Sequence, residues 1–342
     1  MRSVSCILFA LALLVHSFLL PLENSIIPSM EKFLNLEQLP LKKWPEAQQT
    51  DIRTALARRE EKIRVATYNM LFSIHDDEMA AQYRWPKRLP RILELLRHMS
   101  PDLLAVQELF PHQCEDLLPH LDDQYGCYVP DLGSGERNYI FYRKERFQLE
   151  EGRTLPLTSS RSRNKTSHTL AMAKLRDLKT GHLLTIWNTH LPFSNVNHRA
   201  MDATWIAQHL QPFAEAGPTL LCGDLNTFTP FLENEQLPAL DGDYVMQLLC
   251  RGSLRDARTT ALLGHLGPFS TFTNHPDQRL KTQPFSGFGT PGTFLDHILV
   301  SPQIQVLLHA VEPATKDGLF PSDHMPVVMD CLLPPQERAP AS

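Results

Sequence analysis

The stretch that decides the fold is LLCGDLNTFTP, residues 220–230. An apolar run ends at Gly223, and an acid and an amide, Asp224 and Asn226, follow two positions apart before a loop closed by Pro230. Successive side chains of a strand point to opposite faces, so Asp224 and Asn226 lie on the same face. Asp and Asn also end strands and start turns. This stretch alone therefore predicts either a turn or one edge of a functional site.

Acid, amide or imidazole side chains also mark the ends of other predicted strands. They occur in ATYNML, DLLAVQEL, IWNTH, FLDHIL and PSDHMPVV. Ligands of layered α/β proteins gather at strand ends, so the repetition favours one shared site over a series of unrelated turns. The candidate residues are Asn69, Glu108, His190, Asp224, Asn226, Asp296, Asp323 and His324.

Strands and helices alternate along most of the chain. Apolar and β-branched runs predict strands, and WPKRLPRILELLRHMS spaces its leucines as one face of a helix, with its prolines confined to the first turns. This alternation, with hairpin-like strand pairs, predicts an α/β layered fold with mixed sheets. No change of composition interrupts residues 63–333, which we interpret as one domain. Strands are expected at 63–71, 101–109, 138–147, 183–191, 219–226, 293–301 and 325–333, and helices at 85–100, 197–213 and 244–252.

The net charge restricts the kinds of partner. The chain has 342 residues, a formal charge of −5 and a pI of about 6.3. Avid, sequence-independent binding to duplex nucleic acid needs a basic face that releases counterions, and this composition argues against one. A bound divalent cation can still bring a phosphate to an acidic protein.

The N-terminus differs from the rest of the chain. MRSVSCILFALALLVHSFLLPL has one Arg followed by an apolar run, which predicts a secretory signal over residues 1–23. A membrane anchor formed by residues 6–22 is the alternative. Residues 24–62 are expected to be a linker or tether with some helix, and residues 334–342 a C-terminal tail. Export is the preferred location.

Six cysteines leave the redox compartment open. Cys222 and Cys331 lie in strand-like runs, where a reduced core thiol is the usual state. Cys114 and Cys127 could pair if the protein is exported, but the five cysteines outside the leader cannot all pair.

Six motifs in order carry a family resemblance. ATYNML, DLLAVQEL, NTHLPF, CGDLNTF, FLDHILVS and PSDHMPV resemble those of the endonuclease/exonuclease/phosphatase superfamily, which has the deoxyribonuclease-I-like fold. The match spans residues 63 to 333. The resemblance implies a four-layer α/β sandwich, with two packed mixed β-sheets flanked by helices, and Mg²⁺-dependent cleavage of P–O bonds.

Hydrolysis of an anionic phosphate ester needs a cation that neutralises it and polarises phosphorus. Mg²⁺ prefers hard oxygen ligands and keeps several waters, so one or two carboxylates suffice. Glu108 is the strongest ligand candidate, because an unpaired charge after a fully apolar run would be costly. Asn69 and Asp323 are the other expected ligands, and Mn²⁺ could replace Mg²⁺.

Proton transfer is assigned to the imidazoles. A His oriented by a carboxylate can act as a base at neutral pH, and His324 with Asp296, which in similar proteins points toward that His, is the expected pair. His190 would bind phosphate or act on the leaving group. Asp224 would orient the water or a His, and Asn226 would donate its amide to a non-bridging oxygen.

The resemblance adds Glu136, because related proteins carry a Glu just before the corresponding strand that pairs with the first catalytic His. The predicted function is a phosphodiesterase acting on a lipid head group or small phosphate ester, with residues 266–292 lining the pocket. A secreted deoxyribonuclease-I-like endonuclease is the alternative enzyme. A non-catalytic binding module that keeps the fold is the alternative from a different class.

Overall fold

The computed structural model describes residues 22–131, 135, 137–161, 168–193, 195–227, 242–273 and 294–335. Residues 1–21 of the predicted leader, Glu136, the C-terminal tail beyond residue 335 and most of the loop before Asp296 lie outside this range. None of the helices in the described ranges is long and apolar enough to cross a bilayer.

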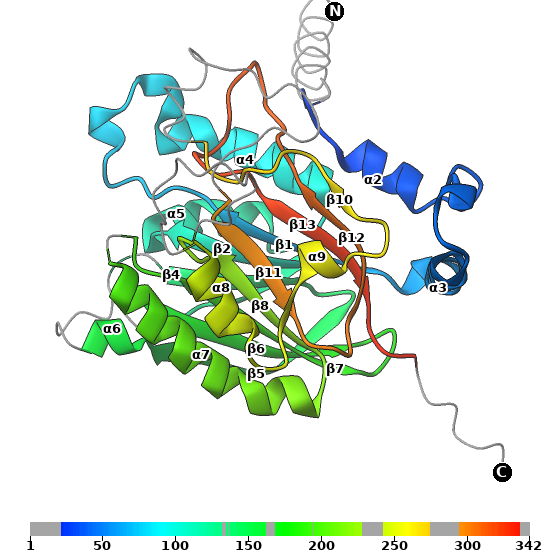
Figure 1. The fold of residues 1–342 in the computed structure, drawn as a ribbon. Coiled ribbons are helices and arrows are strands. Elements are labelled where there is room, and N and C mark those ends of the chain that lie inside the picture. The colour runs from blue at the N-terminus through cyan, green and yellow to red at the C-terminus, as the bar shows by residue number, and fades with distance from the viewer. Residues whose placement is uncertain are drawn as a thin grey trace, which may run out of the picture.

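Two mixed β-sheets form the centre of the molecule (Figure 1). Both sheets contain parallel and antiparallel neighbours, for example the parallel pairs β1–β2 and β7–β8 and the antiparallel pairs β1–β13 and β8–β11. The first sheet has the order β10 (His265–Leu266), β12 (Gln305–Val311), β13 (Val327–Leu332), β1 (Ile63–Asn69), β2 (Leu103–Leu109), β4 (Arg137–Arg143) and β3 (Tyr125–Tyr128). The second sheet has the order β5 (Phe147–Pro156), β6 (Thr169–Asp177), β7 (Leu183–His190), β8 (Thr219–Asp224), β11 (Asp296–Val300) and β9 (Arg255–Asp256).

Helices cover the outer faces of the sheets. In Figure 1, α4 and α5 lie on one side of the sheets, and α7 and α8 on the other. The α-helices are α2 (Ile27–Phe33), α3 (Glu46–Ala57), α4 (Trp85–Met99), α5 (Pro111–Leu117), α6 (Thr158–Arg161), α7 (Val196–Ala216), α8 (Gly242–Cys250) and α9 (Ala257–Thr260). Short 3-10 helices are Leu41–Lys43, Arg59–Glu61, Asp76–Glu78, Ala81–Tyr83 and Leu118–His120.

Among the described residues, three large apolar clusters lie between the four layers, and a fourth, small cluster holds Leu71, Met79 and Tyr83. One lies between the sheets and holds Val65 and Ile63 of β1, whereas Ala66 and Tyr68 of the same strand pack under the first set of helices. The third lies between the second sheet and α7 with α8. Because alternate residues of a strand reach opposite faces, a strand that is apolar throughout fills two clusters. The predicted four-layer α/β sandwich is confirmed.

The segment before β1 contains helix, as expected, but its described part is packed against the domain. Side chains of α2 and α3, including Met30, Ile52 and Leu56, are buried in the same cluster as α4. Apolar residues at helical spacing give each of these helices one buried face. The prediction of a linker or tether with some helix did not include this packing, and its role and the domain boundary at residue 63 stay predictions.

Strand pairing brings the polar strand ends together. Asp224 at the end of β8 lies opposite His190 of the parallel strand β7 and opposite Asp296 of the antiparallel strand β11. Asn69 is the last residue of β1 in the other sheet, where it lies next to Gln107 of β2. The predicted site residues of these strands therefore lie at one edge of both sheets.

Gly223 allows β8 to lie close to β7. Its φ is +154°, and a Cβ at this position would lie 2.0 Å from the backbone oxygen of Thr189. A residue with a side chain would therefore push the strands apart beside Asp224.

We predict that Gly223→Ala lowers the free energy of unfolding by roughly 3 kcal/mol, because overpacking and backbone strain add. Urea denaturation followed by circular dichroism measures the loss. Gly252→Ala is the matched control, since no atom lies within 4 Å of its added Cβ. Equal stability of the two variants would contradict this account of Gly223.

Candidate active site

A bulge in β2 directs Glu108 into the site. The pairing of β2 with β4 shifts register between Val106 and Leu109, and Glu108 has a φ of 54°. A bulge adds a residue to one strand and changes the direction of a side chain. The Glu108 carboxylate accepts hydrogen bonds from Asn69 Nδ2 at 3.0 Å and from the backbone N–H of Phe72 at 3.3 Å.

Asn69 joins two carboxylates that belong to different sheets. Its fully buried amide nitrogen donates to Glu108 Oε1 and to Asp224 Oδ2, both at 3.0 Å. Its Oδ1 accepts the N–H of Leu71 at 3.0 Å, which fixes the orientation of the amide. In this arrangement the Asn69 amide nitrogen positions Glu108 and Asp224. The predicted role of Asn69 as a metal ligand would instead require its Oδ1 to face these two acids.

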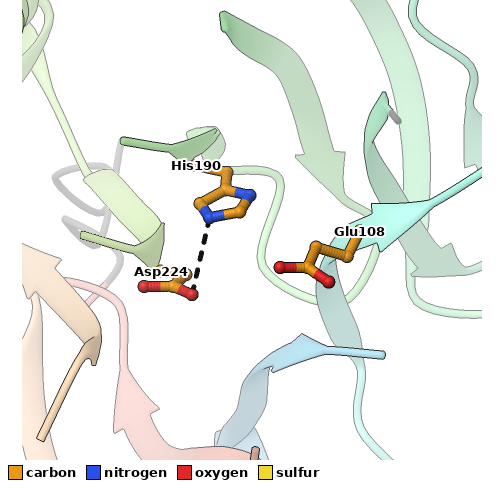
Figure 2. Close-up of side chains that lie close together, drawn as sticks. All are labelled: Glu108, His190 and Asp224. Atoms are coloured by element: carbon orange, nitrogen blue, oxygen red, sulfur yellow. Dashed lines mark ion pairs between the residues drawn. The ribbon is translucent and has the colours of Figure 1, made fainter. Parts of the chain in front are cut away.

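Asp224 lies at the centre of the site and is 1% exposed. Its Oδ1 accepts the N–H of Asn226 at 2.9 Å, and its Oδ2 lies 3.6 Å from Nε2 of both His190 and His324. Figure 2 shows the Glu108 carboxylate directed toward Asp224 and His190. One ligand atom from each of these three residues lies within 4.8 Å of the others.

His324 and Asp296 form the predicted pair. His324 Nδ1 lies 2.8 Å from Asp296 Oδ2, and both side chains are buried. Asp296 Oδ1 is buried without a hydrogen-bond partner among the described residues. With Asp224, these residues form a second group whose ligand atoms lie within 4.8 Å of one another.

Burial and the neighbouring carboxylates have opposite effects on the pKa of His324. Burial lowers the pKa of His324, but Asp296 and Asp224 outweigh it and raise that pKa well above its usual value. Burial also raises the pKa of the Asp224 carboxyl, against the effect of the two imidazoles. The two carboxylates therefore favour the protonated form of the His324 ring.

Asn226 fixes the second imidazole. Its amide nitrogen lies 3.0 Å from His190 Nε2 and donates to the backbone oxygen of Leu191 at 2.9 Å. A donated hydrogen bond at Nε2 requires the neutral ring to carry its proton on Nδ1. To donate to a phosphate oxygen as expected, the Asn226 amide would have to break its hydrogen bond to His190 or to Leu191.

The structure groups the predicted ligands differently from the expectation. Glu108 lies with Asp224 and His190, whereas Asp323 belongs to neither of the two metal-binding groups found among the described residues. The backbone oxygen of Asp323 accepts the N–H of Thr273, and its carboxylate accepts the hydroxyl of Ser322. Glu136 lies outside the described residues, so its assignment stays a prediction.

Several supporting residues were not predicted. Gln107 Nε2 donates to Asn188 Oδ1 at 2.6 Å, which joins the two sheets behind the site. Gln113 Oε1 accepts the N–H groups of Phe110 and Ser73. Asn188 lies two residues before His190, and this alternation is a signal that could have identified it.

The polar residues present fit a divalent cation. Two carboxylates from separate strands approach each other with a buried amide between them, and oxygen ligands of this kind suit Mg²⁺. Two close carboxylates repel each other without a compensating charge. Glu108 and Asp224 are therefore the residues that would hold the cation, with His190 beside them.

We predict that Asp296→Asn lowers the pKa of His324, because a carboxylate that favours the imidazolium is removed. The ring of the variant should then lose its proton at lower pH. Titration of the ring signals by NMR, with a chelator present, measures the change. Asp256→Asn is the control, since Asp256 lies near His297 and not His324. An unchanged His324 titration in Asp296→Asn would contradict the assigned cause.

Comparisons with known proteins identify the family of the chain and support its fold. Residues 66–324 match the endonuclease/exonuclease/phosphatase family. A functionally unknown conserved protein from Enterococcus faecalis V583 is similar, with 23% identity, a TM-score of 0.65, and coverage of 79% of this chain and 100% of the other. A mannosyl-6-phosphatase from Bacteroides thetaiotaomicron has 21% identity and a TM-score of 0.62, with coverage of 79% and 100%.

The TDP2 protein of D. rerio, in complex with a single-stranded DNA product, has 17% identity, a TM-score of 0.59, and coverage of 79% of this chain and 98% of the other. Comparison with curated proteins gives no match. These likenesses support the fold, and the match over residues 66–324 supports membership. The chain belongs to the endonuclease/exonuclease/phosphatase family.

Proposed function

We propose that this protein is a divalent-cation-dependent phosphohydrolase, with Mg²⁺ as the preferred ion and Mn²⁺ as a substitute. The observation that carries the proposal is the convergence of two acid–imidazole groups on Asp224. A binding module that merely keeps the fold has no need of buried acids paired with imidazoles. Burial of such groups costs stability, and titratable groups with perturbed pKa values gather at functional sites.

A cation held by Glu108 and Asp224 would neutralise the phosphate and polarise the P–O bond. Among the residues of this chain, His324 is the one that would accept a proton from the attacking water, at Nε2, which lies 3.6 Å from Asp224 Oδ2.

Asp296 holds His324 in the orientation that this transfer needs. Its carboxylate binds Nδ1, which leaves Nε2 facing Asp224 and the site. As Nε2 takes the proton, Asp296 stabilises the imidazolium. The ester P–O bond opposite the attacking water breaks, the departing oxygen takes a proton from solvent, and His324 returns its proton to solvent.

His190 faces the same space from β7. We assign it to contact with the phosphate or the departing oxygen, and Asn226 and Asp224 to holding its ring. Asp224 is thus the residue shared by both imidazoles, 3.6 Å from each.

We infer a preference for a small or lipid-derived phosphodiester over polymeric DNA from apolar side chains that follow the site residues in the chain. Phe72, whose N–H binds Glu108, contacts Phe110 edge-on at 6.0 Å between ring centroids. Ile74 and Phe193 are 65% and 74% exposed and follow Asn69 and His190 closely in the chain. Exposed apolar groups of this kind suit an acyl or other apolar substituent. The similar TDP2 structure keeps an endonuclease as the second candidate.

A substrate panel tests the proposed activity. Bis-p-nitrophenyl phosphate, p-nitrophenyl phosphate, sphingomyelin vesicles, inositol phosphates and plasmid DNA are each incubated with Mg²⁺ or with EDTA. We expect cation-dependent release from a diester, with sphingomyelin or the small diester hydrolysed faster than plasmid. Preferential nicking of plasmid would favour the endonuclease. No hydrolysis of any ester by the folded protein would favour the binding module.

Substitutions of Glu108 and His324 should change different kinetic properties of the enzyme. We predict that Glu108→Gln raises the Mg²⁺ concentration needed for half-maximal rate, with partial rescue by excess cation, because a charged ligand is lost. His324→Ala should lower kcat by at least about 10²-fold with little change in that concentration, because a proton-transfer group is lost. Mg²⁺ titration of the hydrolysis rate measures both effects.

Two exposed residues provide controls for these variants. Glu115→Gln and His120→Ala make the same chemical changes outside the site, and both should behave as wild type. An unchanged cation dependence in Glu108→Gln would place the cation elsewhere. Near-normal turnover in His324→Ala would reject the assigned base.

Export stays part of the proposal. We infer from the sequence of residues 1–23 that they act as a leader, so the mature N-terminus should lie between about residues 17 and 30. N-terminal sequencing of the protein from fractionated cells tests this. An uncleaved, membrane-bound form would support the anchor instead, and an intact Met1 in the cytosolic fraction would contradict export.

A further inference from the structure

One buried arginine binds two backbone segments beside the candidate active site. Arg88 lies on α4, and its side chain is fully buried. Its Nη1 donates to the backbone oxygen of Met70 at 2.6 Å and to that of Pro321 at 3.2 Å. Its Nη2 donates to the backbone oxygen of Leu71 at 2.7 Å. One guanidinium therefore joins the segment that follows β1 to the segment that precedes β13.

The surroundings of the Arg88 guanidinium show what offsets its burial. Its three hydrogen bonds all end on backbone oxygens, and the Trp85 ring lies 5.5 Å from its central carbon. Removing a charged group from water is costly, and hydrogen bonds from a charged donor to carbonyls offset part of that cost. Loss of the guanidinium would in turn remove a partner from each of three buried carbonyls, which is itself unfavourable.

After β1, Arg88 supports the turn that binds Glu108. Leu71 has a φ of 58°, a left-handed conformation that is strained for a residue with a side chain. Its N–H is bound by Asn69 Oδ1, and its backbone oxygen is bound by Arg88. The next residue, Phe72, donates its N–H to Glu108 Oε2 at 3.3 Å. The guanidinium thus helps to hold the turn that positions a proposed cation ligand.

Before β13, Arg88 supports the segment that carries His324. Pro321, whose oxygen it binds, is followed by Ser322, and Ser322 Oγ lies 2.8 Å from the backbone oxygen of Asn69. The same Oγ accepts the N–H of His324 at 3.3 Å. The segment is therefore held to the end of β1 at two points, by the guanidinium and by the serine. The proposed base and the proposed cation ligand depend on one junction.

We propose that Arg88 is a positioning residue, which clamps the turn that binds Glu108 to the segment that carries His324 and so sets the distance between these two groups. The inference rests on the proposed function, because it assigns Arg88 to the reaction of that site. The planar guanidinium presents N–H groups in fixed, diverging directions, so it can bind both segments at once. An ammonium on a flexible stem lacks this fixed geometry.

Hydrogen–deuterium exchange of the folded protein tests the clamp without any substrate. In Arg88→Met, the amides of residues 70–74 and 320–325 should exchange roughly 10-fold faster or more, because both segments lose a partner, while α7 should exchange as in wild type. Arg97→Met is the matched control, since Arg97 is exposed on the same helix, and it should leave both segments unchanged. Faster exchange in only one of the two segments, or an equal increase throughout the chain, would overturn the proposal.

Steady-state kinetics with bis-p-nitrophenyl phosphate and saturating Mg²⁺ tests the effect on turnover. Arg88→Met should lower kcat by roughly 10²-fold with KM nearly unchanged, because a small displacement of the reacting groups acts on the transition state. Arg88→Lys keeps the charge without the fork, so its kcat should lie between those of wild type and Arg88→Met. Arg97→Met should keep the wild-type kcat. A wild-type kcat in either folded variant of Arg88, or a change in KM alone, would overturn the proposal.

The two measurements separate the clamp from the proposed function. If the folded wild type hydrolyses no ester, the proposed function fails, and the exchange of residues 70–74 and 320–325 still decides whether Arg88 holds the two segments together. If Arg88→Met does not fold, Arg88→Lys replaces it in both measurements, with Arg97→Lys as its control. Arg88→Lys should show a smaller increase of exchange in the same two segments, and unchanged exchange there would overturn the proposal.

Discussion

The hydrogen bonds of Asn69 connect the two halves of the site. One buried amide donates to Glu108 within its own sheet and to Asp224 of the facing sheet, each at 3.0 Å. Two carboxylates this close repel each other, and the amide hydrogens partly offset that repulsion. Behind them, Gln107 and Asn188 join the same two sheets. The relative position of the sheets therefore determines the separation of the acids.

The chemistry of the site follows from this enforced proximity. Asp224 is shared by two imidazoles, and Asp296 adds a second carboxylate to His324. The result is a buried cluster in which the pKa of His324 is raised and the pKa of Asp224 is also raised by burial. A cation between Glu108 and Asp224 would relieve the excess negative charge, which links metal binding to proton transfer through the same carboxylate.

Strand periodicity explains which parts of this arrangement could be predicted from sequence. Alternation predicted that Asp224 faces the site, and the order of strands and helices predicted the layered fold. The direction of Glu108 depends on a bulge and a positive φ, which pairing with β4 creates and no local pattern indicates. Asn69 was expected as a ligand, but its amide orientation is set by the N–H of Leu71. The contacts of Gln113 likewise depend on tertiary packing.

The central claim is that Glu108 and Asp224, brought together from two sheets, form the cation site. A crystal of the protein grown with Mn²⁺ and measured for anomalous scattering tests it directly. The account predicts a strong peak within coordinating distance of both carboxylates. A peak held by Asp224, Asp296 and His324 without Glu108, or no peak at this edge of the sheets, would contradict it.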